Sequence, residues 1–390
     1  MNPSSSGWIK KLLLFLETDS TLIEQSEEAF YNNLKASGFI YGTNIKVVNT
    51  YFDDNIFSDE EKSKLNLCIV LYQTHYKLNR EANFIDSIID FYTKISNAKK
   101  SFFKDILNEK KSSKQLEKII HKRIQIDDNF FTKNFNYFVI NALLYVDVLA
   151  YRKYLMTGNI TKIFIKNLEA AIETIVLKVL NSKLNRSNYD ESLIKLFESS
   201  LRYQNHKVVN YSESITYMNT VFQKQYILDI SCMATWSDKT IDVNEQHFIY
   251  ELSSDLNLDH TKAKRSIQMV NHFYSIYKDH IALLSSKNII QSFYNNSTKM
   301  VRLLISRNRR RLYKELIDSK ELMLLLSQST IRDLTREEQK KVQEQLLDII
   351  KSIPSLAIFL LPGGMLLMPL FIKLIPKLLP SAFDDNRIED

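Results

Sequence analysis

Proline and glycine are distributed very unevenly along this chain of 390 residues. Between residues 8 and 353 there is no proline, and glycine occurs only at positions 38, 42 and 158. Because these two residues interrupt helices most strongly, this part of the chain can form long helices with few breaks. We therefore predict an all-α fold, a multi-helix bundle. Five of the six prolines lie between residues 354 and 380, so long uninterrupted helices are not expected at the C-terminal end.

The composition is that of a globular protein, with 45% hydrophobic and 25% charged residues. The length suits two or three domains of about 100 to 200 residues each. Two cysteines, Cys68 and Cys232, are too few for a disulfide framework and favour a reducing compartment, here the cytoplasm. A net charge of +7 permits an anionic partner without requiring one.

The C-terminal run at residues 353–372 contains no charged residue. Twenty residues at about 1.5 Å each could cross a hydrocarbon layer of about 30 Å. Its prolines and its glycine pair predict a kinked span or a re-entrant hairpin, with an apolar hairpin buried in the helical body as the alternative. The residues that mark this predicted membrane segment are Pro354, Pro362, Gly363, Gly364, Pro369, Pro376 and Pro380.

The segment just before this run has its own helical signals. Thr335 and Glu338 have the spacing of a capping box, in which each side chain bonds the other residue's backbone N–H. The helix that follows would place one apolar stripe inward, formed by Val342, Leu346, Ile349 and Ile350.

Residues 333–383 contain LTREE, the spacing of Pro354, Pro362 and Pro369, and the sequence KLIPKLLPSAF. This pattern resembles the transmembrane core of the Letm family, the leucine-zipper/EF-hand-containing transmembrane proteins of the mitochondrial inner membrane. The resemblance implies cation exchange against protons, with ribosome binding by the domain that follows. The family has an acidic residue shortly after its central proline, where this chain has Met365, and little of the following domain is expected after residue 383.

From this resemblance we expect a membrane-associated protein of bacterial type that binds or senses a partner at the cytoplasmic membrane face. Cation/proton exchange by an oligomer and ribosome binding are the alternatives. The expected partners are therefore membrane lipid, the ribosome and further copies of the chain.

A helix, an acidic turn and a second helix are predicted around the sequence ATWSDKTIDVNE. The pattern, at about residues 216–281, resembles the tellurite-resistance B (TerB)-like module, a small all-helical domain. The resemblance implies a divalent cation held by Asp238, Asp242 and Glu245. The residues themselves are also explained without a metal, with Asp242 and Glu245 capping the second helix and Asp238 in the turn.

The most basic part of the chain is a helical stretch at residues 289–326. A solvated helix face is the ordinary explanation of its charge, and a phospholipid headgroup or ribosomal RNA is the functional one. No aromatic residues alternate with the charges as in single-strand binding, so we predict no DNA partner. The basic residues are Arg302, Arg307, Arg309, Arg310, Arg311 and Lys314.

Motifs for catalysis and for nucleotides are not found. The glycines are too sparse for a P-loop or a dinucleotide-binding turn, and there is no G-x-S-x-G or H-E-x-x-H. We predict a protein that is not an enzyme, binds no nucleotide and has no cofactor besides the cation at the acidic turn.

The predicted layout has four parts. They are an N-terminal helical domain at residues 1–204, a TerB-like module at 205–285, a basic long-helix region at 286–352, and the Letm-like hydrophobic segment with an acidic tail at 353–390.

Overall fold

The chain folds into two compact units, and every regular element in the described ranges is helical. The computed structural model describes residues 1–96, 111–124, 143–183, 209–235, 241–277, 301–329, 332, 334–353, 356 and 368–379. Unit 1 comprises residues 1–127 and 132–287, and unit 2 comprises residues 128–131 and 288–390. The all-α prediction is confirmed for these ranges. The predicted domain boundaries near residues 204 and 285 fall outside them and stay predictions.

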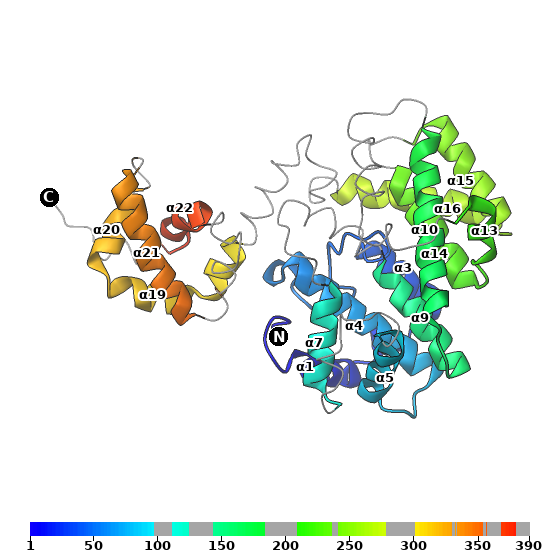
Figure 1. Cartoon of the computed structure of the whole chain (residues 1–390), viewed down its shortest axis with the longest axis horizontal. Helices are drawn as coiled ribbons and strands as arrows, with labels where there is room; N and C mark the ends of the chain where they lie inside the picture. The colour runs from blue at the N-terminus through cyan, green and yellow to red at the C-terminus, as the bar shows by residue number, and fades with distance from the viewer. Residues whose placement is uncertain are drawn as a thin grey trace. The chain divides into compact units, whose positions relative to one another are not determined.

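Unit 1 is built around α4 (Asp59–Leu78), a helix of 20 residues that is buried over most of its length. It packs against α5 (Phe84–Ser96), α7 (Ser113–Ile124) and α9 (Leu144–Thr157), as Figure 1 shows. It also packs against the short helix α2 (Thr21–Glu24). The N-terminal helix α1 (Trp8–Thr18) packs against α7 and buries Trp8, Ile9, Leu12 and Leu16.

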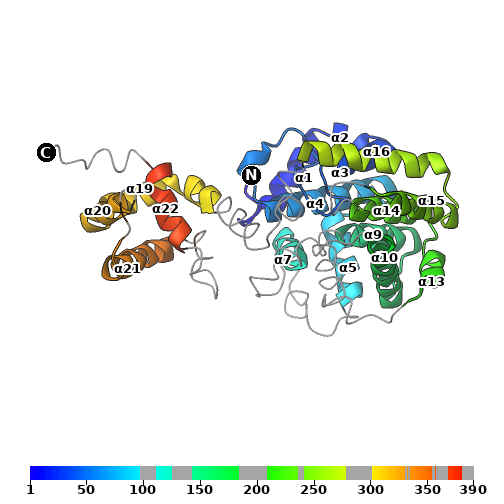
Figure 2. The same cartoon turned by 90° about the horizontal axis from the view of Figure 1, so that it is seen from above.

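The other helices of unit 1 gather around α10 (Lys162–Ser182). It contacts α9, α13 (Tyr211–Thr216), α14 (Val221–Ala234) and α15 (Val243–Asp255). The last helix, α16 (His260–Tyr277), packs on α14 and α15 and runs beside α3 (Glu27–Ala36), as Figure 2 shows. Buried residues of α1 to α16 form one hydrophobic cluster.

Capping residues start several helices where the sequence places them. Reciprocal capping boxes join Ser58 to Glu61 at α4 and Asp242 to Glu245 at α15. Each box satisfies backbone N–H groups that have no partner inside the helix, which is worth about 1 kcal/mol. At the start of α16, the Asp259 side chain accepts a hydrogen bond from the Thr261 N–H.

Unit 2 is a smaller helical body. Its elements are a helical stretch at residues 301–307, α19 (Arg309–Ile317), α20 (Lys320–Gln328), α21 (Arg336–Ser352) and α22 (Met368–Leu378). The predicted long helix is divided at Asn308, whose side-chain amide donates to the Leu304 carbonyl at 2.8 Å and so competes with the backbone pattern. The α20 helix packs against α19, α21 and α22.

The apolar stripe predicted for α21 is confirmed, with Val342, Leu346, Ile349 and Ile350 all buried in the unit 2 cluster. Residues of the charge-free run also enter this cluster: Ile353, Leu356 and Phe371 are buried against the same helices. Most of the run lies outside the described residues. Among the helices that the structure does describe, none has the length and apolar character required to cross a membrane.

Candidate binding surface on the C-terminal unit

The six basic residues singled out in the sequence all lie exposed on unit 2, and we call them the basic surface. They share their helices with Val301, Ile305, Leu312 and Leu316, which are fully buried at spacings of four residues. Because a helix with one buried stripe turns its other side to solvent, the core of unit 2 itself positions these charges outward. The basic surface consists of Arg302, Arg307, Arg309, Arg310, Arg311 and Lys314.

Other cations of unit 2 are neutralised by neighbours. Arg332 pairs with Glu338 at 2.6 Å, and Lys341 pairs with Glu321 at 3.0 Å. The latter contact holds the pKa of Glu321 below its ordinary range through the bond from Lys341. No such ion pair joins Arg309, Arg310, Arg311 or Lys314 to a carboxylate within the described residues. The charge of these four residues is therefore not balanced by an ion pair within the described part of the unit.

Three of these arginines occupy the first turn of α19. That turn contains no acidic residue, and the N-cap residue Asn308 makes no side-chain capping bond. The N-terminus of a helix carries partial positive charge, so each cation placed there is unfavourable by about 0.3–1 kcal/mol at an exposed site. An anionic partner would relieve this repulsion, because it would bind the guanidinium groups at the positive end of the helix.

At the acidic turn, two of the three predicted metal-ligating residues are described, and both take part in capping bonds. Asp242 accepts from the Glu245 N–H at 2.8 Å, and Glu245 accepts from the Asp242 N–H at 2.9 Å. These bonds confirm the capping interpretation of the two carboxylates. Asp238 lies outside the described residues, and among the residues that are described no group of three metal-ligating side chains is found. The divalent cation stays a prediction from the resemblance.

The residues that mark the predicted membrane segment are only partly described. Pro369 lies in the first turn of α22 and Pro376 lies inside the same helix, near its end. The remaining five marker residues, Pro354, Pro362, Gly363, Gly364 and Pro380, fall outside the described residues.

Sequence reasoning missed a buried ionic cluster in unit 1. Asp229 on α14 is 0% exposed, and its carboxylate lies 3.5 Å from the ammonium of Lys35 on α3. Asp229 and Lys35 are far apart in the chain, so no local spacing could have shown that they meet. The one available signal was an aspartate inside the apolar stretch YILDISCMA of this helix.

The fold and the basic surface together define an all-helical protein with a separate, basic, helical C-terminal unit. Comparison with known proteins shows what part of that unit is similar to: a sequence model of the family described as "LETM1-like, RBD" matches residues 334–390. The match includes α21 and α22. The RBD description therefore falls on the segment that was predicted to be the membrane core, whereas the corresponding domain was expected beyond residue 383.

Two curated proteins of yeasts are similar to the chain over short stretches. "LETM1 domain-containing protein YLH47, mitochondrial" of Saccharomyces cerevisiae is 33% identical over 64 residues, which are 16% of this chain and 14% of that protein. "LETM1 domain-containing protein mdm28, mitochondrial" of Schizosaccharomyces pombe is 40% identical over 55 residues, 14% of this chain and 12% of that protein. No solved structure matches the chain.

These comparisons support the resemblance to the Letm family. The chain spans only a small part of the length of these relatives, so their activities are not transferred with the similarity. Both relatives are named as mitochondrial, which gives no support to the expected bacterial type. The TerB-like resemblance stays a prediction.

Proposed function

We propose that this protein is a LETM1-like binding protein, without catalytic activity, whose C-terminal unit contacts the ribosome through the basic surface. The observation that carries the proposal is the row of Arg309, Arg310 and Arg311 at the start of α19, exposed and without an ion pair among the described residues. The match to an RBD family model over residues 334–390 supports it, since α21 packs against α19 and α20 within the same unit.

The chemistry of ribosomal RNA suits this surface. Arginine binds phosphate oxygens through two parallel N–H bonds, and each phosphate neutralised by a cation releases bound counterions. Binding through three to six cations would therefore fall steeply with rising salt concentration. It would depend on charge and shape rather than base sequence, because phosphate contacts position a protein without reading bases.

The test is co-sedimentation of the full-length protein with purified ribosomes at low and high salt. The Arg309→Gln, Arg310→Gln and Arg311→Gln triple variant should lose most of the binding at low salt. The matched control replaces Lys340, Lys341 and Lys351 by glutamine, which removes the same charge from the same unit but at cations that already have ion pairs. Equal loss in both triple variants, or no co-sedimentation of the unchanged protein, would contradict the proposal.

A second candidate is binding or sensing at a membrane face. It is supported by the charge-free run at residues 353–372 and by the similarity to LETM1 domain proteins named as mitochondrial. Fractionation tests it: the full-length protein should stay with membranes after a carbonate wash, whereas a chain ending before Ser352 should be released. Release of both would exclude this candidate while leaving ribosome binding open.

Cation/proton exchange by an oligomer stays an alternative prediction. Flux into proteoliposomes that the Pro362 and Pro369 double variant leaves unchanged would count against it.

A further inference from the structure

Unit 1 contains a cavity of about 290 Å³ that the proposed function does not use. It lies between α3, α14 and α16, and its wall brings together side chains more than two hundred residues apart in the chain. The volume is close to the lower end of the range of small-molecule sites, about 300–1,000 Å³. Six of the lining residues carry the argument: Tyr31, Lys35, Phe222, Gln225, Lys262 and Arg265.

The floor of the cavity is a fixed polar network centred on Asp229. This buried carboxylate accepts hydrogen bonds from the Tyr31 hydroxyl at 2.9 Å and from Gln225 Nε2 at 3.0 Å, and it pairs with Lys35. Gln225 Nε2 also lies 3.3 Å from Ser266 Oγ on α16. The network therefore holds polar groups from all three helices in one arrangement. A buried ion pair adds little net stability compared with apolar packing, so stability alone does not account for this network.

Charge at the rim of the cavity is unevenly neutralised. Glu27 pairs with Arg152, and Glu28 pairs with Arg265 at 3.2 Å. Lys35 is engaged with Asp229. The ammonium of Lys262 lines the cavity, is exposed, and forms no ion pair with a carboxylate in the described part of the chain. The cavity thus offers one cation that a bound anion could neutralise, with the guanidinium of Arg265 beside it.

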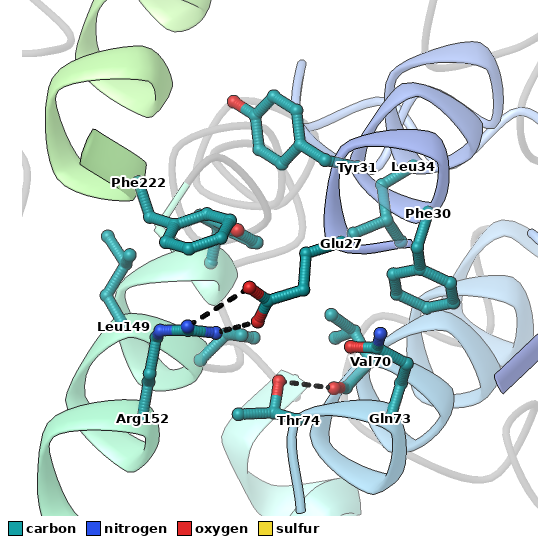
Figure 3. A pocket seen from close by; sticks show the side chains of 12 residues that line it. Glu27, Phe30, Tyr31, Leu34, Val70, Gln73, Thr74, Leu149, Arg152 and Phe222 are labelled. Carbon is teal, nitrogen blue, oxygen red and sulfur yellow. Dashed lines mark hydrogen bonds and ion pairs between the residues drawn. The ribbon is translucent and has the colours of Figure 1, made fainter. Parts of the chain in front are cut away.

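One wall of the cavity is aromatic. The Phe222 ring and the Tyr31 ring both line it, and the Arg152 guanidinium lies 4.2 Å from the centre of the Phe222 ring. Figure 3 shows this wall from a neighbouring pocket, with the Glu27 carboxylate facing Arg152 and Phe222 above them. A flat apolar body would lie against these rings.

The neighbouring pocket drawn in Figure 3 shares Glu27, Tyr31 and Phe222 with the cavity and has a volume of about 20 Å³. That is room for one water-sized group. The Gln73 side chain lines it, is 4% exposed, and its Nε2 donor has no hydrogen-bond acceptor among the described residues. A buried donor of this kind is costly unless a polar group satisfies it, and the pocket has room for one water molecule to do so.

We propose that this cavity binds a small organic anion, with its negative group on Lys262 and Arg265 and an apolar, flat body against Phe222 and Tyr31. The site lies within unit 1 and is independent of the basic surface, so either can fail without the other.

Benzoate is the probe, with benzyl alcohol and benzylamine as neutral and cationic molecules of the same shape. Titration of the full-length protein, followed by calorimetry or ligand-observed NMR, should give saturable benzoate binding in about the millimolar range, as expected for nine non-hydrogen atoms. The other two probes should bind at least about tenfold more weakly, since neither carries the negative charge that forms an ion pair with the Lys262 ammonium.

Two variants place the binding in this cavity. Lys262→Gln should weaken benzoate about tenfold, whereas Lys264→Gln, exposed on the same helix and not lining the cavity, should not. Val221→Trp fills the cavity from a rim position that is 71% exposed, so it should abolish binding and leave the melting temperature unchanged. Equal binding of the three probes, benzoate binding unaffected by Lys262→Gln, or no saturable binding of benzoate would overturn the proposal.

Discussion

The phenol hydroxyl of Tyr31 on α3 donates a hydrogen bond of 2.9 Å to the carboxylate of Asp229 on α14, 198 residues further along the chain. Asp229 has no exposed surface, and burial together with this carboxylate raises the pKa of Tyr31 well above its ordinary value. The contact joins the N-terminal helices of unit 1 to the helices around α10.

Tyr31→Phe should therefore destabilise unit 1. The substitution keeps the ring but leaves a buried carboxylate with one donor fewer, which costs about 1–3 kcal/mol. Urea denaturation followed by circular dichroism measures the change. Tyr51→Phe is the control, because Tyr51 is 70% exposed. An effect of equal size in both variants would show that the Asp229 contact is not responsible.

Removing one partner of the buried ion pair between α7 and α9 should have a larger effect. Arg123 Nη2 lies 2.8 Å from Asp147 Oδ1, and the Tyr92 hydroxyl also donates to Asp147. Arg123→Met leaves a charged carboxylate in the core and should cost about 3–5 kcal/mol. The double variant Arg123→Met with Asp147→Leu should recover most of that loss. Melting temperatures measured by calorimetry for the two variants test this prediction. A double variant no more stable than Arg123→Met would contradict it.

The stability of unit 1 should fall as the pH drops below about 6.5 because of His75. Its Nε2 lies 2.8 Å from the Ala82 carbonyl and must donate there, so Nδ1 accepts from the Tyr151 hydroxyl at 2.9 Å. This arrangement requires the neutral ring, and burial lowers the pKa of His75 from 6.5. Between the lowered pKa and 6.5 the unfolded chain binds more protons than the folded one, so stability is complete above this window and is lost as the pH falls through it.

The His75→Gln variant tests this pH dependence, since glutamine can still donate to Ala82 but does not titrate. Denaturation midpoints at pH 7.5 and about 5.5 should differ less for the variant than for the unchanged protein. The same difference in both would assign the pH dependence to other groups.

Thr335→Ala should loosen the start of α21, the helix at which the LETM1-like match begins. The Thr335 side chain accepts from the Glu338 N–H, and loss of such a cap costs about 0.5–2 kcal/mol. Bonds from Arg332 and from the Thr335 N–H lower the pKa of Glu338 to about 2, so this carboxylate stays ionised at neutral pH. Hydrogen exchange at residues 336–340 should become faster in the variant, while exchange in α4 of unit 1 should not change.

The residues of the basic surface could be predicted from the sequence, but their ion pairing could not. All six residues were found from their composition and lie exposed, because the helical period turns them away from Val301, Ile305 and Leu312. The sequence did not show which cations of unit 2 form ion pairs with carboxylates. The pairing of Lys341 with Glu321 joins two helices, and its existence depends on how α20 and α21 pack.

By itself, the sequence determined that this protein is helical and where several helices begin. Those features depend on residues three or four apart, such as Ser58 with Glu61, Asp242 with Glu245, and Thr335 with Glu338. Residues at this spacing contact each other in a helix whatever the tertiary structure is. Only the tertiary structure decided that Tyr31, Lys35 and Asp229 form one buried network beneath a cavity. That arrangement requires α3 and α14 to pack side by side, and their contact is set by the burial of whole helix faces rather than by any local spacing.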